Sequence, residues 1–186
     1  MKKILLLGTC ALVVFSATAQ DNEAMKKWMD YSTPGDMQAL LAKSEGNWDI
    51  QISMWMAPGQ EPMKATATSD VKMVLGGRYE QIDNKGSFNG MPYEGMGMIG
   101  YDNAKKLFQS SWIDNMGTGV TPMEGNYDAA TKTLTLSGKM YEPMSGKDID
   151  MRQTITFVDD THETIDMYHD ENGSSFKVME MMLTKK

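Results

Sequence analysis

Apolar and polar residues alternate with a period of two from Trp48 to the C-terminus. In residues 48–56 the apolar side chains occupy every second position, beginning with Trp48, Ile50 and Ile52. This alternation is typical of β-strands that bury one face. The pattern recurs between short turns rich in glycine, asparagine and aspartate. Strands are predicted over residues 48–56, 65–75, 78–83, 92–101, 107–114, 120–127, 133–141, 148–158, 163–169 and 175–184, with a loop over 84–91.

About ten short strands at regular spacing, without helices between them, favour an antiparallel sandwich or barrel over an α/β sheet. Closure of the sheet also removes exposed strand edges. The sequence therefore predicts an all-β fold: a single antiparallel up-and-down β-barrel of about ten strands with a short N-terminal helical lead-in.

The helical lead-in is predicted within residues 21–46. Residues 24–30 can form a short helix, and a second helix carries Met37, Leu40 and Leu41 on one face. A hydroxyl at position 32 or 33 is expected to cap this second helix, with Pro34 in its first turn. Gly46 ends the segment, and residues 47–186 form the predicted barrel domain.

Residues 1–20 have the pattern of a bacterial secretory signal peptide. Lys2 and Lys3 precede an apolar run over residues 4–15, and small residues follow at 17–19. We expect cleavage after Ala19 or Gln20 and a location in the periplasm or outside the cell. The alternative is an uncleaved anchor, but the apolar run is short for a membrane-spanning helix. No stable membrane insertion is expected after cleavage.

Charge and cysteine content exclude several classes of function. With a net charge of −7, the chain lacks the excess of basic residues that is typical of nucleic-acid-binding proteins. The same negative charge disfavours attachment to anionic membranes. The one cysteine, Cys10, lies in the predicted signal, where Thr9 and the continuing apolar run disfavour lipidation. The predicted barrel therefore has no disulfide, thiolate nucleophile or cysteine metal ligand.

Several motifs, taken in order, resemble one bacterial family, named domain of unknown function 1579. The resemblance implies a lipocalin-like (calycin-type) barrel with a helical lead-in, and it implies no reaction. The chain departs from the family at Gln38, where many members carry histidine, so a function that needs that histidine is not expected here. The motifs are Pro34-Gly35, Gly46-x-Trp48, Leu75-Gly76-Gly77-Arg78-Tyr79, Tyr93-Glu94-Gly95-x-Gly97, Gly100-Tyr101-Asp102-Asn103, Trp112-Ile113-Asp114-x-Met116 and Glu124-Gly125.

The candidate binding site lies within residues 75–119. Trp112, Asp114 and Met116 alternate onto one face of a strand. An inward Asp114 needs a partner, and Arg78 is the expected one. Such a pair could orient the polar head of a ligand or tie one end of the barrel. The full set of candidate ligand-binding residues is Arg78, Tyr79, Tyr101, Trp112, Asp114 and Met116.

The glycines at 95, 97 and 100 resemble a nucleotide-binding fingerprint, but they lie between strands and not at the start of a helix. Sheet curvature or the close approach of a ligand explains them. No Gly-x-Ser-x-Gly elbow occurs, and the paired carboxylates fall on predicted turns.

Metal and haem binding rest on weaker patterns. Methionine is abundant, at 20 of 186 residues, and Met-x-Met pairs at 54/56, 96/98 and 179/181 could offer thioethers to Cu(I). Filling of an adaptable apolar interior is the other interpretation. His162 and His169 are predicted on opposite strand faces and form no paired metal site. His169 as a haem ligand is an analogy to nitrobindin-like barrels alone.

The leading interpretation is an exported, non-catalytic barrel that binds a small hydrophobic ligand and needs no cofactor or metal. The alternative is a structural or protein-interaction module of the cell envelope with a filled barrel. An enzyme using Arg78, Tyr79, Tyr101 and Asp114 is a third possibility, for which no substrate suggests itself.

Overall fold

The computed structural model describes residues 14–171 and 173–186. The chain divides into two compact units, Met1–Thr33 and Pro34–Lys186. The first contains helix α1 (Val14–Ser32), which is longer than the helix predicted over 24–30. No helix among the described residues has the length and apolar character needed to cross a membrane. Residues 1–13 of the predicted signal peptide lie outside the described residues.

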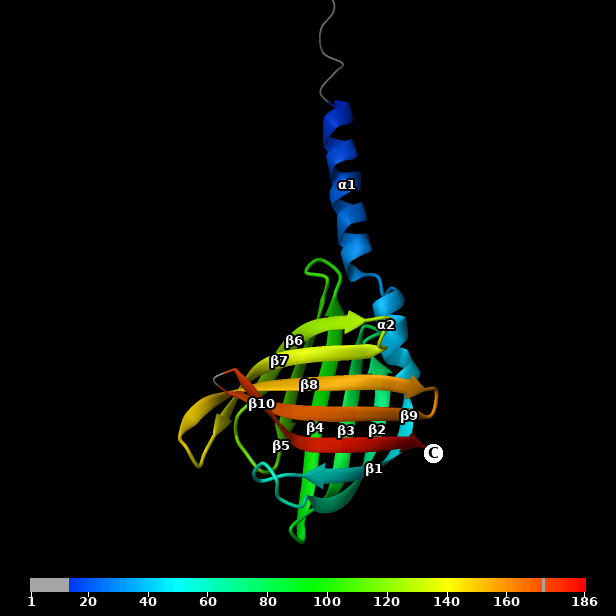
Figure 1. Ribbon diagram of the computed structural model, residues 1–186. Coiled ribbons are helices and arrows are strands. Elements are labelled where there is room, and N and C mark those ends of the chain that lie inside the picture. The colour runs from blue at the N-terminus through cyan, green and yellow to red at the C-terminus, as the bar shows by residue number, and fades with distance from the viewer. Residues whose placement is uncertain (1–13, 172) are drawn as a thin grey trace, which may run out of the picture. The chain divides into compact units, whose positions relative to one another are not determined.

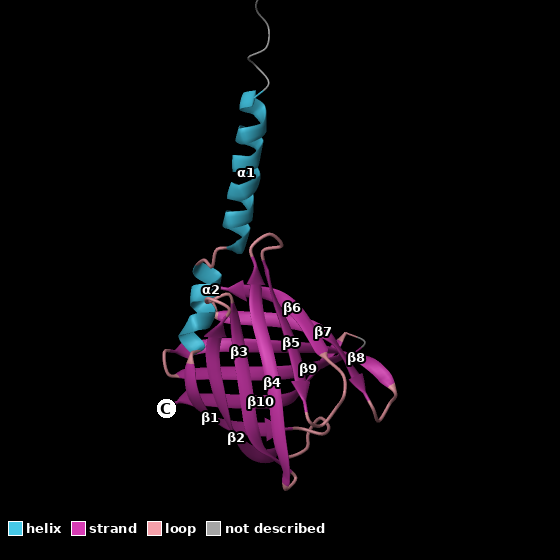
Figure 2. Ribbon diagram, turned by 180° about the vertical axis from the view of Figure 1, so that it is seen from behind, coloured by secondary structure: helices cyan, strands magenta, loops and turns pink. Residues whose placement is uncertain are grey.

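The second unit is a closed antiparallel barrel of ten strands, which confirms the predicted fold class. Each strand pairs with its neighbours in the sequence, and the last strand pairs with the first. Strands β7–β10 form one wall and cross the strands of the opposite wall, β2–β5, at a steep angle (Figures 1 and 2). The strands are β1 (Gly46–Met54), β2 (Met63–Val74), β3 (Tyr79–Phe88), β4 (Met91–Asp102), β5 (Leu107–Asp114), β6 (Thr121–Asp128), β7 (Thr133–Glu142), β8 (Lys147–Asp159), β9 (His162–Glu171) and β10 (Ser174–Lys185).

Pairing between β1 and β10 closes the barrel. The register runs without a break from Trp48 opposite Lys185 to Met54 opposite Met179. A β-bulge in β10 lies between Lys177 and Met179, opposite β9. Closure leaves neither of these terminal strands with an unpaired edge inside the sheet, so inward side chains of all ten strands face one shared interior.

One predicted element is wrong. Residues 84–88 were expected in a loop, but they continue β3, and a tight turn at Asn89 and Gly90 leads into β4. Both turn residues have positive φ, 50° and 79°. Asn-Gly is the preferred sequence for a two-residue hairpin turn of this kind. The polar character of 84–88 therefore reflects a strand in the barrel wall and not a loop.

A short helical segment precedes β1 and packs against the barrel. It comprises α2 (Asp36–Leu41) and the 3-10 turn η1 (Ala42–Ser44). The expected hydroxyl cap is wrong, because Gly35 is the N-cap residue and its N–H donates to Gln38 Oε1 at 2.8 Å. The hydroxyls of Ser32 and Thr33 instead donate to the carbonyl oxygen of Met29 in α1.

Buried contacts fix this segment at one end of the barrel. Gln38 Nε2 donates to the carbonyl oxygen of Tyr101 at 3.0 Å. Trp48, which is 1% exposed, donates through Nε1 to the carbonyl oxygen of Ser44 at 2.8 Å. Leu40 and Leu41 extend a core cluster in which Phe108, Leu134 and Leu136 are almost fully buried. The barrel end beside α2 is therefore closed by a packed core.

We predict that Gly125→Ala destabilises the barrel. Gly125 in β6 lies opposite Leu136 of β7, and a Cβ atom there would overlap the carbonyl oxygen of Thr135. The backbone must shift to accept the methyl group, so the free energy of unfolding should fall by about 1–3 kcal/mol. Urea unfolding measures the change. Gly117→Ala is the control, because nothing lies within 4 Å of its added Cβ. Equal stability of the two variants would contradict this packing.

Candidate ligand-binding site

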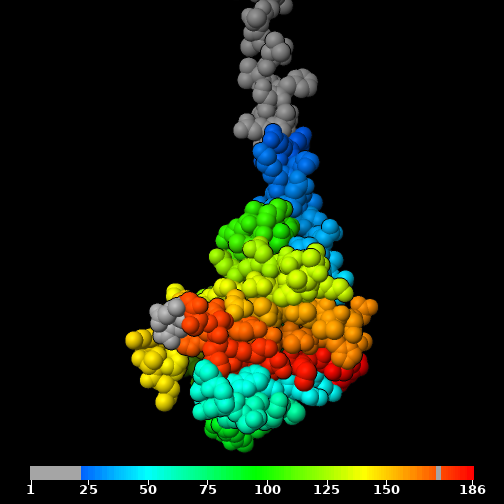
Figure 3. All heavy atoms as spheres, viewed as in Figure 1, coloured from blue at the N-terminus to red at the C-terminus, as the bar shows by residue number. Residues whose placement is uncertain are grey.

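The barrel interior contains a cavity of about 480 Å³. Residues from all ten strands line it, together with Leu41 and Ser44 at the end beside α2. The lining continues to Asp114 and Met116 at the opposite end, where Met116 is 50% exposed. Figure 3 shows a continuous surface over β8, β9 and β10, without a hollow on that face. The cavity therefore runs along the barrel, from the packed end toward the end formed by the C-terminus of β5.

Methionine supplies much of the apolar lining. Thioether side chains are flexible and adapt to irregular ligands. Of the three Met-x-Met pairs, only the pair at 179 and 181 lies wholly in the cavity, while Met56, Met96 and Met98 are exposed. The described residues contain no group of three or more histidine, cysteine, aspartate or glutamate side chains arranged for a metal. The lining methionines are Met54, Met116, Met123, Met140, Met151, Met167, Met179 and Met181.

Asp114 is the centre of a hydrogen-bonded cluster at the far end of the cavity. Its Oδ2 atom accepts from Trp112 Nε1 at 3.1 Å and from the Tyr93 hydroxyl at 3.5 Å. Its Oδ1 atom accepts from the Met116 backbone N–H at 2.9 Å. Burial, reinforced by the Asp114 charge, raises the pKa of Tyr93 to about 12, so Tyr93 stays a neutral donor. Three donors thus fix the orientation of the Asp114 side chain.

The glycines of β4 make room for Trp112. Gly97 lies opposite Trp112 across the β4–β5 pair, and a Cβ at Gly97 would approach the indole Cε3 to 2.8 Å. A Cβ at Gly95 would overlap the same ring. These two positions therefore admit the indole flat against the wall, which is a close-approach role for glycine in a strand.

The structure brings together half of the predicted site residues. Trp112, Asp114 and Met116 line the cavity as a group, and Tyr93 joins them. The lining does not include Arg78, Tyr79 or Tyr101.

Tyr79 is 40% exposed and lies over Gly100, where a Cβ would approach its ring to 2.5 Å. Tyr101 packs on Phe108 with ring centroids 4.9 Å apart, in the core next to α2. Both tyrosines therefore serve packing in this structure and contribute no surface to the cavity.

The expected ion pair between Arg78 and Asp114 is wrong. Arg78 Nη1 donates to the carbonyl oxygens of Leu75 at 3.1 Å and Gly76 at 3.5 Å, within the turn that joins β2 to β3. Strands β3 and β5 run in the same direction, because each pairs antiparallel with β4. Arg78 precedes the start of β3 while Asp114 ends β5, so the two residues lie at opposite ends of the barrel.

Two buried glutamates at the end near α2 were missed by the sequence analysis. Glu80 is 4% exposed and Glu163 is 8% exposed, and both line the cavity. Ser44 Oγ donates to Glu163 Oε1 at 2.6 Å. Glu80 Oε2 has no hydrogen-bond partner among the described residues. Their spacing could have revealed them, because Glu80 lies two residues before inward Ile82, and Glu163 two before inward Ile165.

Burial perturbs both carboxyls. Desolvation, followed by the negative charges of Glu163 and Glu45, raises the pKa of Glu80 to about 8. Desolvation also raises the pKa of Glu163, against the opposing effects of the Ser44 hydrogen bond and the Lys185 charge. Glu80 therefore holds a proton at neutral pH.

Two more polar atoms in the cavity wall lack partners among the described residues. They are Ser69 Oγ and Asn84 Oδ1, and their residues lie directly opposite one another in the β2–β3 pair. Ser69 is 3% exposed. Buried polar groups normally form hydrogen bonds, so unpartnered groups that face a cavity indicate a place for a polar ligand atom.

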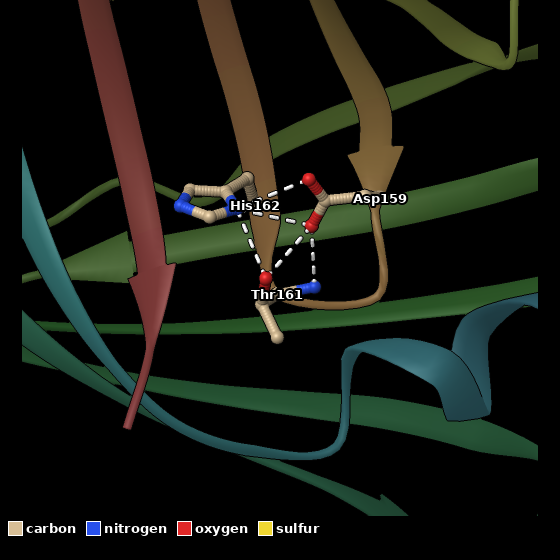
Figure 4. A network of polar contacts seen from close by, with 3 residues as sticks. All are labelled: Asp159, Thr161 and His162. Carbon is tan, nitrogen blue, oxygen red and sulfur yellow. Dashed lines mark hydrogen bonds and ion pairs between the residues drawn. The ribbon is translucent and has the colours of Figure 1, made fainter.

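Neither histidine joins the cavity lining. His162 is the first residue of β9, next to the turn from β8, and its Nδ1 lies 3.0 Å from Asp159 Oδ1 (Figure 4). Thr161 donates to the same oxygen through its backbone N–H and its hydroxyl, both at 2.8 Å. These donors lower the pKa of Asp159 to about 2. The network is a turn-stabilising arrangement, and the described lining offers no histidine to a haem iron.

The comparisons with known proteins agree with this architecture. The family model described as "Protein of unknown function (DUF1579)" matches residues 33–185. The chain belongs to this family. No curated protein matches it significantly. Among solved structures, the crystal structure of Rv2717c from M. tuberculosis is similar, with a TM-score of 0.58 at 11% identity. The match covers 83% of this chain and 99% of that one, and at this identity it shows the fold alone.

We predict that Glu80 makes the barrel less stable as the pH rises. Its pKa is raised from 4.5 to about 8 in the folded protein, so the folded state retains a proton that the unfolded chain releases. The resulting loss in the free energy of unfolding is absent below pH ~4.5 and grows until pH ~8. It reaches on the order of 3 kcal/mol between pH 5 and 8.

Urea unfolding at several pH values should therefore show that Glu80→Gln removes much of this loss. Glu163 remains in the variant and keeps a loss of the same sign. Glu124→Gln, at an exposed position of β6, is the matched control and should follow the wild-type curve. Parallel curves for wild type and Glu80→Gln would show that Glu80 is not buried as described.

Proposed function

We propose that this protein is a non-catalytic binding protein that holds a small hydrophobic molecule inside its barrel. The observation that carries the proposal is the interior cavity of about 480 Å³. Its volume falls within the range of small-molecule sites, which combine apolar walls with a few placed polar groups. The methionine-rich walls and the isolated polar groups at Glu80, Ser69 and Asn84 have this composition.

The two ends of the cavity suggest a direction of entry. The end beside α2 is closed by the packed core and by the hydrogen bonds of Ser44 and Trp48. The other end reaches exposed Met116, next to the Trp112–Asp114 cluster. We infer that a ligand enters beside Met116, with its deepest part near Glu80. The alternative of a structural module with a filled barrel is not supported, because the interior is hollow.

A fluorescence titration tests the proposal. N-phenyl-1-naphthylamine, a neutral apolar dye that brightens in apolar surroundings, should bind saturably with one dye per barrel. Ala67→Phe should abolish or strongly weaken binding, because Ala67 lines the cavity and the added ring occupies ligand space. Each Å² of apolar dye surface that the ring keeps out of the cavity costs about 25 cal/mol of binding free energy. Even partial exclusion of the dye is therefore measurable.

Thr68→Phe is the matched control. Thr68 is the next residue of β2, points to the opposite face and is exposed. It should bind the dye as wild type does. Dye binding that is unaffected by Ala67→Phe, or lost equally in both variants, would contradict binding inside the barrel.

We also propose that the protein is exported, on the support of the signal-like pattern in residues 1–20. Intact mass measurement of the protein from its own host should give a chain that begins at Gln20 or Asp21. A chain that retains residues 1–19 would contradict cleavage.

A further inference from the structure

All charged side chains that line the cavity are carboxyls. Among the described residues, the lining contains Glu80, Asp114 and Glu163, and it contains no lysine, arginine or histidine. The barrel is low in polarity, so this charge is poorly screened inside it. A ligand with a carboxylate or phosphate head would find no positive side chain in this lining and would be repelled by its carboxylates. The lining therefore selects against anionic amphiphiles such as fatty acids.

The three carboxyls differ in how many hydrogen-bond donors they have. Asp114 accepts hydrogen bonds from Trp112, Tyr93 and the backbone of Met116. Glu163 accepts from Ser44. Glu80 alone has an oxygen atom, Oε2, that is buried in the lining without a partner among the described residues. A buried carboxyl in this state is costly, and a donor or a positive charge beside it would offset the cost.

Building on the proposed function, we propose that Glu80 binds the protonated amino group of the natural ligand, so that the cavity selects lipophilic primary amines. The ammonium group supplies both the missing donor and the missing positive charge in one atom. The apolar body of the ligand then extends along the methionine-rich walls toward Trp112. Ser69 and Asn84 lie along this path and could accept a second hydrogen bond from a hydroxyl or amide on the ligand.

The charges around Glu80 favour a cation at this position. Glu163 on β9 and Glu45 before β1 both act on Glu80 with negative charge. One positive group at this end, Lys185, acts on Glu163, while its Nζ donates to the carbonyl oxygen of Lys43 and lies 5.1 Å from the Trp48 ring centroid. Lys185 is outside the cavity lining, so it leaves the interior position beside Glu80 open to a ligand cation.

Binding of an ammonium group should expel a proton. The pKa of Glu80 is about 8 in the empty barrel, so its carboxyl is mostly protonated at pH 7. The ion pair requires the carboxylate, and the proton passes from Glu80 to the buffer as the amine binds. Between pH 6 and 8 the alkylamine stays charged, so its affinity should rise up to roughly tenfold per pH unit in the lower part of this range.

Displacement of N-phenyl-1-naphthylamine tests the head group. Decylamine, decanol and decanoate have the same apolar chain and different heads. At pH 7.5 decylamine should displace the dye at least about tenfold more effectively than decanol, and decanoate should be the weakest, since a hydrogen bond to a charged group is worth about 1.5–3 kcal/mol. With each variant compared at its own dye affinity, Glu80→Gln should remove the preference for decylamine over decanol, whereas exposed Glu124→Gln should keep it.

Calorimetry of the wild-type protein provides a readout that does not depend on a variant. Decylamine binding at pH 7, measured in buffers of different ionisation enthalpy, should release close to one proton, and decanol binding should release none. If the dye binds inside the barrel but decylamine shows no preference over decanol and releases no proton, the assignment of Glu80 is overturned while the proposed function stands. If neither the dye nor any of the three compounds binds, the proposed function fails and this inference with it.

Discussion

Pairing of the first strand with the last is the constraint on which the rest of the structure depends. The unbroken register between β1 and β10 turns a ten-stranded meander into a barrel, so every inward side chain faces one enclosed space. A barrel of this strand number is wide enough for its side chains to leave its interior partly unfilled. The α2–η1 segment and the core around Phe108 fill one end. The cavity follows from this closure, since an open sheet would have no interior to line.

Burial inside a closed barrel also carries a free-energy cost for polar groups. Glu80 and Glu163 are both buried, and desolvation raises the pKa of each. Ser44 partly offsets the cost at Glu163, which ties the helical segment to β9. Nothing comparable serves Glu80 Oε2 among the described residues. An apolar side chain at position 80 would cost less free energy to bury, so the burial of Glu80 supports the proposed ligand contact at this position.

The sequence predicted the architecture because its main signal is local. Alternation over ten stretches locates the strands and assigns the inward faces, and it grouped Trp112 with Asp114 and Met116 before the structure was known. What it could not supply is register. The partner of Asp114 depends on which strands run alongside β5 and in which direction, and Tyr93 occupies the place given to Arg78. The same alternation is consistent with inward Glu80 and Glu163, but we did not predict them, because a charged residue on an apolar face is easily taken for a surface residue. Whether the barrel is hollow depends on how side chains of ten strands meet, which no local pattern encodes.

A crystal structure of the protein grown with decylamine would show whether the hollow barrel holds an apolar ligand with its head at Glu80. We expect the alkyl chain within the cavity and the amine nitrogen about 3 Å from a carboxylate oxygen of Glu80, with the chain leading toward Trp112. A barrel whose side chains fill the interior, or a ligand bound with its amine at Asp114 or on the outer surface, would contradict it.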